Sequence, residues 1–312
     1  MSDKVLNELL QEKADITARI NLIPYDGSPE IKQSGNKKYI YIRKRIGSKL
    51  TSTYVDIYSD ELFALLLKQS KELRELKKKL RHVEKDLALL GYIQDDLDDK
   101  VILNLEYARS NMKQIIYDQA ILEGVSTTFP QTEAIIENGT VNGMKAEDIQ
   151  KILNLKHAWE FVLDKDILSY PSNLYVLSHI AKLVNEGFYD NGGRLRGVPV
   201  TIGGSTYKPE LPIEADVKED IKAIVDSRKN IPTKAIELCL YCMKKQIFID
   251  GNKRASVIFA NHYLISNGMG LLVIPFELVS EFKKLLVEYY EDRDNGNAIK
   301  FLLDKCYLKI DD

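Results

Sequence analysis

The spacing of apolar residues changes period several times along the chain. Over residues 3–22 apolar side chains recur every three or four positions, which predicts an amphipathic helix. Two runs rich in β-branched and aromatic residues follow at 37–45 and 49–57. Because the short segment 46–48 between them contains a glycine, the two runs predict a β-hairpin.

A long second helix is predicted after this hairpin, from an N-cap at Ser59 to about Leu90. Its apolar residues follow the three-and-four spacing of a coiled-coil seam, at Leu62, Leu66, Leu73, Leu76, Leu80, Val83, Leu87 and Leu90. The seam most simply packs against the first helix, while a homodimer through it is the alternative. We therefore predict a coiled-coil-like helix–β-hairpin–helix arm over residues 1–92.

Residues 93–312 are predicted to form a second, mainly α domain. Helical patterns recur between Gly, Asn, Asp and Pro breaks, at about 101–123, 129–137, 145–163, 172–187, 214–228, 231–247, 253–267, 276–290 and 296–304. The segment 197–207 is β-branched and rich in glycine, so we predict a short β-hairpin flap there.

Composition narrows the class of protein. The chain has 312 residues, and its 44 Lys and Arg nearly balance 46 Asp and Glu, so any basic surface is local. No apolar run approaches the length of a membrane span or a secretory signal, so we expect a cytoplasmic protein without a membrane partner. The three cysteines lack further ligands at zinc spacing, and we expect them to be buried as small apolar residues.

The stretch Phe248-Ile249-Asp250-Gly251-Asn252-Lys253-Arg254 carries the strongest chemical signal. Apolar helical patterns precede and follow it, so it lies at a helix N-terminus, where free N–H groups and the helix dipole attract anions. Lys253 and Arg254 add positive charge, and Asp250 offers hard oxygen ligands for magnesium. A nucleotide polyphosphate suits this combination, although a capped helix start with solvated charges has the same local pattern.

This stretch resembles the Fic/Doc family motif, His-x-Phe-x-(Asp or Glu)-(Gly or Ala)-Asn-(Gly or Lys)-Arg. Two further segments resemble family features in the expected order: the inhibitory-type segment 122–128 and the segment 193–196, which leads into the flap. The resemblance extends over residues 100–308. It implies a Fic-type helical bundle in which ATP and Mg²⁺ bind the loop and AMP, or another phosphate-containing group, moves to a Ser, Thr or Tyr hydroxyl of a target protein.

Roles for individual residues follow from the resemblance. Asp250 would hold the metal, Phe248 would anchor the loop in the core, and Gly251, Asn252, Lys253 and Arg254 with the loop amides would hold phosphates. The flap would align an extended target segment by strand addition. Its residues are Val200, Thr201, Ile202, Gly203 and Gly204.

The chain departs from the family at the general base. Gln246 occupies the position of the catalytic histidine, and a carboxamide accepts no proton near neutral pH. Losing a positioned base typically lowers the rate about 10²- to 10⁴-fold. Lys253 matches the Doc branch, where the resemblance implies phosphate rather than AMP transfer, and Val257 replaces a second arginine.

Glu123 and Gly124 match the family's inhibitory motif, in which a glutamate pairs with a motif arginine and blocks productive ATP binding. Gln119 stands at that motif's Ser/Thr position. We expect Glu123 to reach Arg254. The alternative is an ordinary glutamate at a helix C-terminus before a glycine cap.

The predicted hairpin of the arm carries a basic and aromatic group of side chains, which suits phosphates and exposed bases. The same residues on short strands can be a solvated edge that discourages aggregation, and this is the simpler interpretation. They are Lys38, Tyr39, Tyr41, Arg43, Lys44 and Arg45.

Three functions stay open from the sequence. The first is a Fic-fold protein that binds ATP and Mg²⁺ and is related to the protein adenylyltransferases, with activity altered or reduced by Gln246. The second is a regulatory pseudoenzyme that binds nucleotide or a partner protein. The third is a Doc-like phosphotransferase or a nucleic-acid-associated module.

Overall fold

The computed structural model describes residues 2–23, 25–46, 49–92, 96–139, 141 and 143–310. The chain divides into two compact units, Met1–Ile93 and Gln94–Asp312. Within the described residues no helix has the length and apolarity needed to cross a membrane.

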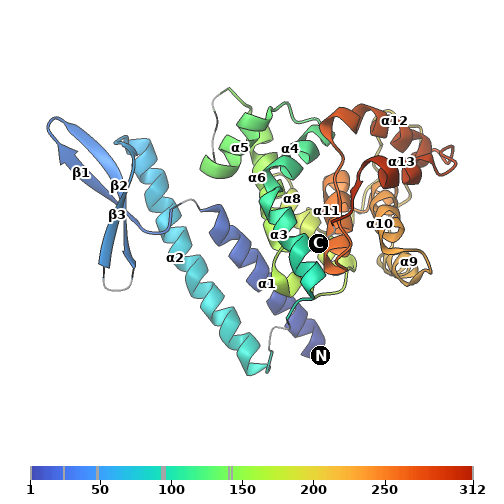
Figure 1. The fold of residues 1–312 in the computed structure, drawn as a ribbon, viewed down its shortest axis with the longest axis horizontal. Helices are drawn as coiled ribbons and strands as arrows, with labels where there is room; N and C mark the ends of the chain where they lie inside the picture. Colours follow the sequence, from blue (N-terminus) through green and yellow to red (C-terminus); the bar gives the residue numbers. More distant parts are fainter. Residues whose placement is uncertain are drawn as a thin grey trace. The chain divides into compact units, whose positions relative to one another are not determined.

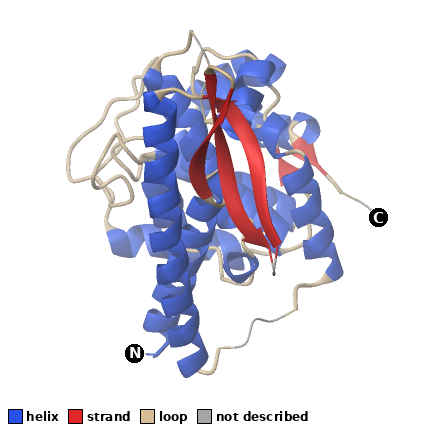
Figure 2. Cartoon of the chain, turned by 90° about the vertical axis from the view of Figure 1, so that its left-hand side faces the viewer, coloured by secondary structure: helices blue, strands red, loops and turns tan. Residues whose placement is uncertain are grey.

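The amino-terminal unit consists of two helices and a three-stranded antiparallel sheet of order β1-β2-β3 (Figures 1 and 2). Its elements are α1 (Ser2–Leu22), β1 (Ser28–Ser34), β2 (Lys37–Ile46), β3 (Lys49–Ile57) and α2 (Asp60–Leu89). Ser59 caps α2, as predicted, by accepting a hydrogen bond from the Leu62 N–H. The predicted hairpin turn at Gly47 and Ser48 lies outside the described residues.

The seam of α2 packs on α1, as the leucine spacing predicts. Leu76, Val83 and Leu87 form one buried cluster with Leu10 and Ile16 of α1. The sheet has its own cluster, since Ile40 and Ile42 of β2 pack with Leu66 near the start of α2. β2 therefore buries one face against α2, and Val55 of β3 is partly buried against the same cluster.

The strand β1 is a correction to the predicted two-stranded hairpin. Its sequence has a single β-branched residue, Ile31, and a proline near its start, so the strand pattern is weak. β1 pairs along the whole of its length with β2, from Ser28 opposite Arg43 to Ser34 opposite Lys37. Pro29 is tolerated because β1 is an edge strand.

The carboxy-terminal unit is a mainly helical bundle with a two-stranded β4–β5 pair, in which α11 packs beside α10 and α8 (Figure 1). Its elements are α3 (Asp99–Ser110), α4 (Met112–Leu122), α5 (Phe129–Asn138), α6 (Ala146–Val162), α7 (Lys165–Leu168), α8 (Leu174–Val184), α9 (Glu214–Asp226), α10 (Ile231–Lys245), α11 (Asn252–Ser266), β4 (Leu271–Leu272), the 3₁₀ turn η1 (Phe276–Leu278), α12 (Val279–Tyr290), α13 (Asn297–Lys305) and β5 (Tyr307–Leu308).

Two predictions for this unit were wrong in detail. The helix expected over 101–123 is two helices that break at Asn111, whose side-chain amide donates to the Tyr107 carbonyl. The flap expected as a β-hairpin is irregular and turns at Gly203 and Gly204. The β-branched residues of the flap form no strand, because no partner strand lies along them in the described structure.

The three cysteines of this unit are buried, as expected from the sequence. Cys239, Cys242 and Cys306 are all free thiols.

Candidate functional site

The loop between α10 and α11 is shaped by two residues with left-handed backbone. Gln246 ends α10 at φ 48°, and Gly251 caps the start of α11 at φ 71°. A Cβ atom at Gly251 would lie 2.8 Å from Asn185 Oδ1, so a larger residue would collide as well as being strained. The loop therefore leads into the amino end of a 15-residue helix, where the first N–H groups have no partner within the helix.

Asn252 holds the loop together from within. Its Oδ1 accepts from the Phe248 N–H at 2.9 Å, and its Nδ2 donates to the Phe248 carbonyl at 2.8 Å. Its Nδ2 also lies 3.1 Å from Gln246 Oε1. The sequence suggested Asn252 as a phosphate ligand, whereas in the fold its carboxamide braces the loop. Phe248 is 1% exposed and anchors the loop in the core.

Gln246 is likewise engaged in the loop. Its Nε2 donates to the Met243 carbonyl at 2.6 Å, while its Oε1 accepts from Asn252. The described contacts of the buried histidines lie elsewhere: His157 meets Glu186, and His262 meets Ser172 and the Ile167 carbonyl. Gln246 thus acts as a structural brace at the end of α10.

Arg254 is almost completely buried, at 2% exposure, and its guanidinium organises the inner wall of the loop. Nη1 donates to the Val184 carbonyl at 2.7 Å, and Nη2 donates to Asp250 Oδ2 at 2.9 Å. The Asp250 side chain remains half exposed. Its carboxylate can therefore still meet a cation at the surface of the loop.

Glu123, the residue that ends α4, lies between the two cations of the loop. Its Oε2 is 3.6 Å from Arg254 Nε, and its Oε1 is 3.6 Å from Lys253 Nζ. Both separations are ion pairs too long for hydrogen bonds. Among the described residues, Glu123 Oε1 and Arg254 Nε are buried and have no hydrogen-bond partner. The carboxylate therefore faces two cations without a hydrogen bond to either.

Gln119 lies one turn before Glu123 and joins α4 to neighbouring helices. It is buried, its Nε2 donates to the Arg254 carbonyl at 2.9 Å, and its Oε1 accepts from the Trp159 indole N–H at 2.9 Å. The residue that departs from the inhibitory motif thus docks α4 directly on α11. Its signal in the sequence was a polar residue among the apolar positions of α4.

Sequence reasoning also missed Asn185, which directly follows α8 and is fully buried. Its Nδ2 donates to the Asp250 carbonyl at 2.9 Å and to the Gly192 carbonyl at 3.2 Å. One side chain therefore joins the loop between α10 and α11 to Gly192, directly before the segment that leads into the flap. Its only signal in the sequence was an asparagine directly after the apolar pattern of α8.

Lys283 of α12 adds a further positive charge near this group. Burial lowers its pKa, the neighbouring Lys253 charge lowers it further, and Glu123 opposes both effects. Val257, three residues after Arg254, is buried beside Gln119 and Leu122. Lys253, Arg254 and Lys283 are thus cations that an anion bound here would meet.

The flap is fixed at both ends by charged side chains. Arg196 is 5% exposed and donates to the carbonyls of Gln246, Val198, Pro209 and Glu210. Glu291 accepts from the Thr206 N–H at 2.7 Å and from the hydroxyls of Ser205 and Thr206. These hydrogen bonds lower the pKa of Glu291 to about 2. The turn at Gly203–Gly204 lies between the two anchors.

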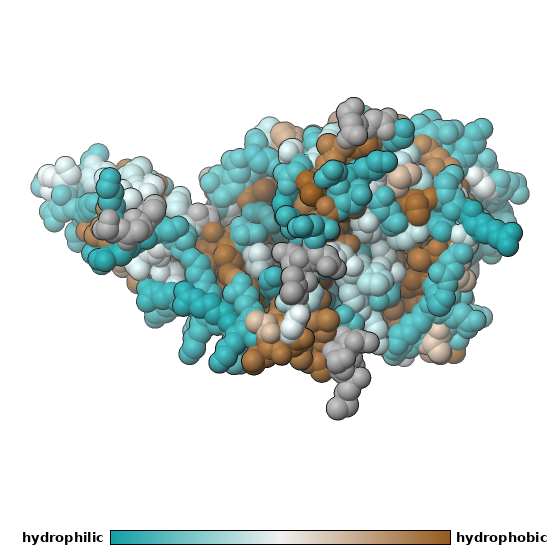
Figure 3. Space-filling view, turned by 60° about the horizontal axis from the view of Figure 1, so that its bottom comes forward, coloured by the Kyte–Doolittle hydropathy of each residue, from teal (hydrophilic) through white to brown (hydrophobic). Residues whose placement is uncertain are grey.

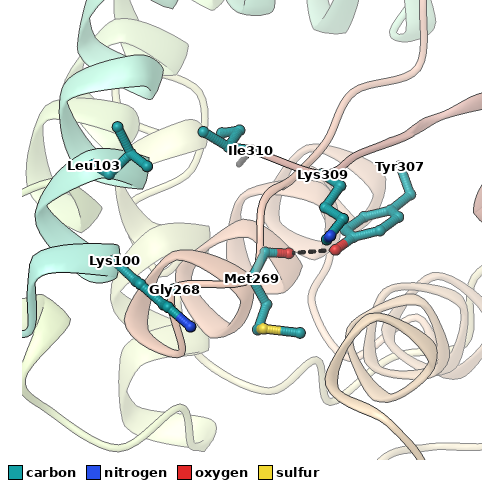
Figure 4. Close-up of a pocket in the computed structure, with 7 residues that line it drawn as sticks. All are labelled: Lys100, Leu103, Gly268, Met269, Tyr307, Lys309 and Ile310. Carbon is teal, nitrogen blue, oxygen red and sulfur yellow. Dashed lines mark hydrogen bonds between the residues drawn. The ribbon is translucent and has the colours of Figure 1, made fainter. Parts of the chain in front are cut away.

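Two cavities of this unit differ in their relation to the loop. One of about 530 Å³ lies beside the loop and is lined by Tyr189, Arg194, Gly197 and Ile249 among others. Another, of about 390 Å³, is lined by Lys100, Met269, Tyr307 and Lys309, and there the Tyr307 hydroxyl donates to the Met269 carbonyl (Figure 4). Of the two, the first includes a residue of the loop, Ile249, in its lining.

The region that contains this loop resembles a known protein family. Residues 172–264, which include α8, the flap and the whole loop, match the Fic/DOC family. This chain contains a Fic domain. Residues 3–64 match a domain of unknown function, DUF6788. No curated protein matches the chain.

Solved structures of similar fold also contain Fic domains. A Fic domain-containing signaling protein from Bacteroides thetaiotaomicron is 16% identical, with a TM-score of 0.52 over 68% of this chain and 86% of that one. Residues 134–508 of Fic-1 from C. elegans are 18% identical, with a TM-score of 0.50 over 78% of this chain and 77% of that one. At these identities the likeness shows the shared fold of the Fic domain. Glu123 lies outside the 172–264 match.

Proposed function

We propose that the Fic domain binds ATP with Mg²⁺ at the loop Asp250–Arg254, and that it is related to protein adenylyltransferases, with transfer activity held low. The observation that carries the proposal is the buried Arg254 Nε, which faces Glu123 at 3.6 Å and has no hydrogen-bond partner among the described residues. A buried cationic N–H without an acceptor lowers stability, so it favours the binding of an anion that can accept its hydrogen bond. A phosphate oxygen has the charge and the geometry to supply it.

The residues of the loop fit the proposed ligand. The N–H groups at the start of α11, with Lys253 and Arg254, would hold phosphates. Lys283, which interacts electrostatically with Lys253 and Glu123, would supply a third cation. Asp250, half exposed, would hold Mg²⁺. When bound, Mg²⁺ would neutralise negative charge on the phosphates during the reaction. Asn252 and Gln246 would keep the loop in shape rather than contact the ligand.

Two features would hold transfer activity low. Glu123 occupies the anion site, so a nucleotide must first displace its carboxylate. Gln246 offers no base for the proton of the target hydroxyl, and its amide is tied to the Met243 carbonyl. Positioning and electrostatics by the remaining loop can still support slow transfer. The target would be a Ser, Thr or Tyr hydroxyl of a protein that docks along Val200–Gly204.

A regulatory pseudoenzyme is the second candidate, and the engagement of Gln246 favours it. The Gln246 carboxamide donates to the Met243 carbonyl of α10 and accepts from Asn252, so both of its polar atoms serve the shape of the loop. A protein of this kind would use nucleotide binding to change its affinity for a partner. It would transfer no group.

Labelled nucleotides separate these functions. The full chain is incubated with Mg²⁺ and ATP labelled at the α or the γ phosphate, alone and with lysate proteins, and ATP affinity is measured by calorimetry. Protein-bound α label supports AMP transfer, and γ label alone supports Doc-like phosphate transfer. ATP binding without either label supports the pseudoenzyme. If ATP–Mg²⁺ does not bind even after Glu123→Gln, the nucleotide site is refuted.

A further inference from the structure

The sheet of the amino-terminal unit has one covered and one open face. Side chains alternate across a strand, and Ile40 and Ile42 of the central strand β2 face Leu66 of α2. Tyr39, Tyr41, Arg43 and Arg45 of β2 therefore project from the opposite face. We call this the open face.

Three tyrosines form the centre of the open face. The ring of Tyr54 in β3 lies between two tyrosines of β2, with centroids 6.2 Å from Tyr39 and 5.6 Å from Tyr41. Tyr54 is 50% exposed. The rings meet at tilted and edge-on angles, so together they offer an aromatic surface that extends across two strands.

Positive charge surrounds these rings. Lys32 of β1 lies 4.4 Å from the centroid of Tyr41, and Arg43 is about half exposed. Arg45 continues the same row and is exposed. An acidic residue of β1, Glu30, lies among these cations, 3.2 Å from Lys32 and 3.9 Å from Arg43. The group formed by Lys32, Arg43, Arg45 and Glu30 therefore keeps a net positive charge after its internal ion pairs are counted.

The charge of the whole unit has the same sign. Residues 28–57 contain seven Lys and Arg against two Asp and Glu, and residues 1–93 contain 18 against 13. Residues 94–312 have the opposite balance, 26 against 33. In Figure 3 the left-hand end, which contains the sheet β1–β3, presents mainly hydrophilic side chains on the side shown. An excess of positive charge confined to one unit suits a polyanionic partner.

We propose that the open face binds single-stranded nucleic acid. Cations that only protect a sheet belong on its edge strands, whereas Arg43 and Arg45 lie on the central strand, beside the tyrosines. Aromatic rings next to cations bind unpaired bases by stacking and the phosphate backbone by charge. In a duplex the bases are already stacked on one another, so the rings would have nothing to stack on. The inference is independent of the nucleotide site.

The test measures fluorescence anisotropy of labelled oligonucleotides with the full chain at several salt concentrations. The probes share one mixed sequence as single-stranded RNA, single-stranded DNA and duplex DNA. We expect both single strands to bind more tightly than the duplex, and the tighter of the two identifies whether the 2′-hydroxyl contributes. Absence of single-strand binding at low salt overturns the proposal.

Variants separate stacking from general attraction. Tyr54→Leu should weaken single-strand binding roughly 5- to 150-fold, the effect of losing one stacked base, while Tyr54→Phe should retain it. Arg43→Gln with Arg45→Gln should lower the slope of log K against log salt by about 1.4 for two lost phosphate contacts. Unchanged binding in both sets overturns the proposal.

A matched control removes the same charge elsewhere on the unit. Lys78 and Lys79 are exposed on α2, so Lys78→Gln with Lys79→Gln lowers the charge equally without touching the open face. This pair should leave the affinity within about twofold of wild type, the scale of ordinary surface changes. An equal loss of affinity in the control pair would mean non-specific attraction and would refute a site on the open face. Binding of duplex DNA as tight as that of the single strands, unchanged by Tyr54→Leu, would refute it as well.

Discussion

Replacing Glu123 by glutamine should make the protein less stable and its nucleotide binding tighter. The change keeps the size of the side chain and removes its charge. The wild-type carboxylate is 12% exposed and lies 3.6 Å from both Lys253 Nζ and Arg254 Nε. In Glu123→Gln the two cations lose a fixed anion, so the folded protein loses an interaction that a bound phosphate can replace.

The magnitude follows from these distances. At 3.6 Å and an effective dielectric constant of about 20, each pair is worth about 4 to 5 kcal/mol before desolvation. Burial of the carboxylate offsets much of this, and Arg254 keeps Asp250 as a partner at 2.9 Å. We therefore expect the free energy of unfolding to fall by about 1 to 3 kcal/mol. ATP–Mg²⁺ affinity should rise roughly 10- to 70-fold, which corresponds to about 1.4 to 2.5 kcal/mol.

The assay combines calorimetric titration of ATP–Mg²⁺ with urea unfolding of the same preparations. Glu281→Gln is the control, since Glu281 pairs with Lys305 at 2.9 Å on the exposed side of α12 and should change neither quantity. The opposite signs of the two effects distinguish a competing anion from a general loss of structure. A folded Glu123→Gln protein that binds ATP no more tightly than wild type would refute the reasoning.

Three further predictions concern the base, the core and the flap. The double variant Gln246→His with Glu123→Gln should label itself with ATP more strongly than either single variant, because each change removes a separate block to transfer. A double variant that binds ATP but transfers no label would favour the regulatory pseudoenzyme. Burial lowers the pKa of His262 to about 4 from its ordinary 6.5, so its stabilising contribution is present above pH 6.5 and lost as the pH falls toward 4. Urea unfolding should show about 3 kcal/mol of this loss in wild type and not in His262→Gln. Because the pKa of Glu291 is lowered to about 2 from 4.5, its hold on the flap should persist above pH 4.5 and weaken toward pH 2. Glu291→Gln should speed deuterium exchange around Ser205 and Thr206 at neutral pH, and equal exchange would show that another contact fixes the flap.

The sequence by itself determined the local elements and the chemical character of the loop. Helical periodicity and the Ser59 cap gave most of the helices, because an amphipathic stripe and a cap depend on residues a few positions apart. The placement of the motif before α11 followed in the same way from the apolar patterns on either side of it. The resemblance to the Fic/Doc motif, confirmed at the family level, added the expected partners of that loop.

Only the tertiary structure decided which distant residues meet around the loop. Gln119 reaches the Arg254 carbonyl across 135 positions, and Asn185 reaches the Asp250 carbonyl across 65. No local period encodes such distances, since they depend on how α4, α8 and α11 pack. The tertiary structure likewise decided that β1 forms a strand despite its weak pattern, since it pairs with β2, and that the flap stays irregular, since no strand pairs with it in the described structure. Strand formation requires a partner as well as strand propensity. The close contact between Gly251 and Asn185 also depends on the tertiary structure. The sequence contains the glycine, but it is the position of Asn185 after α8 that leaves no room for a larger residue there.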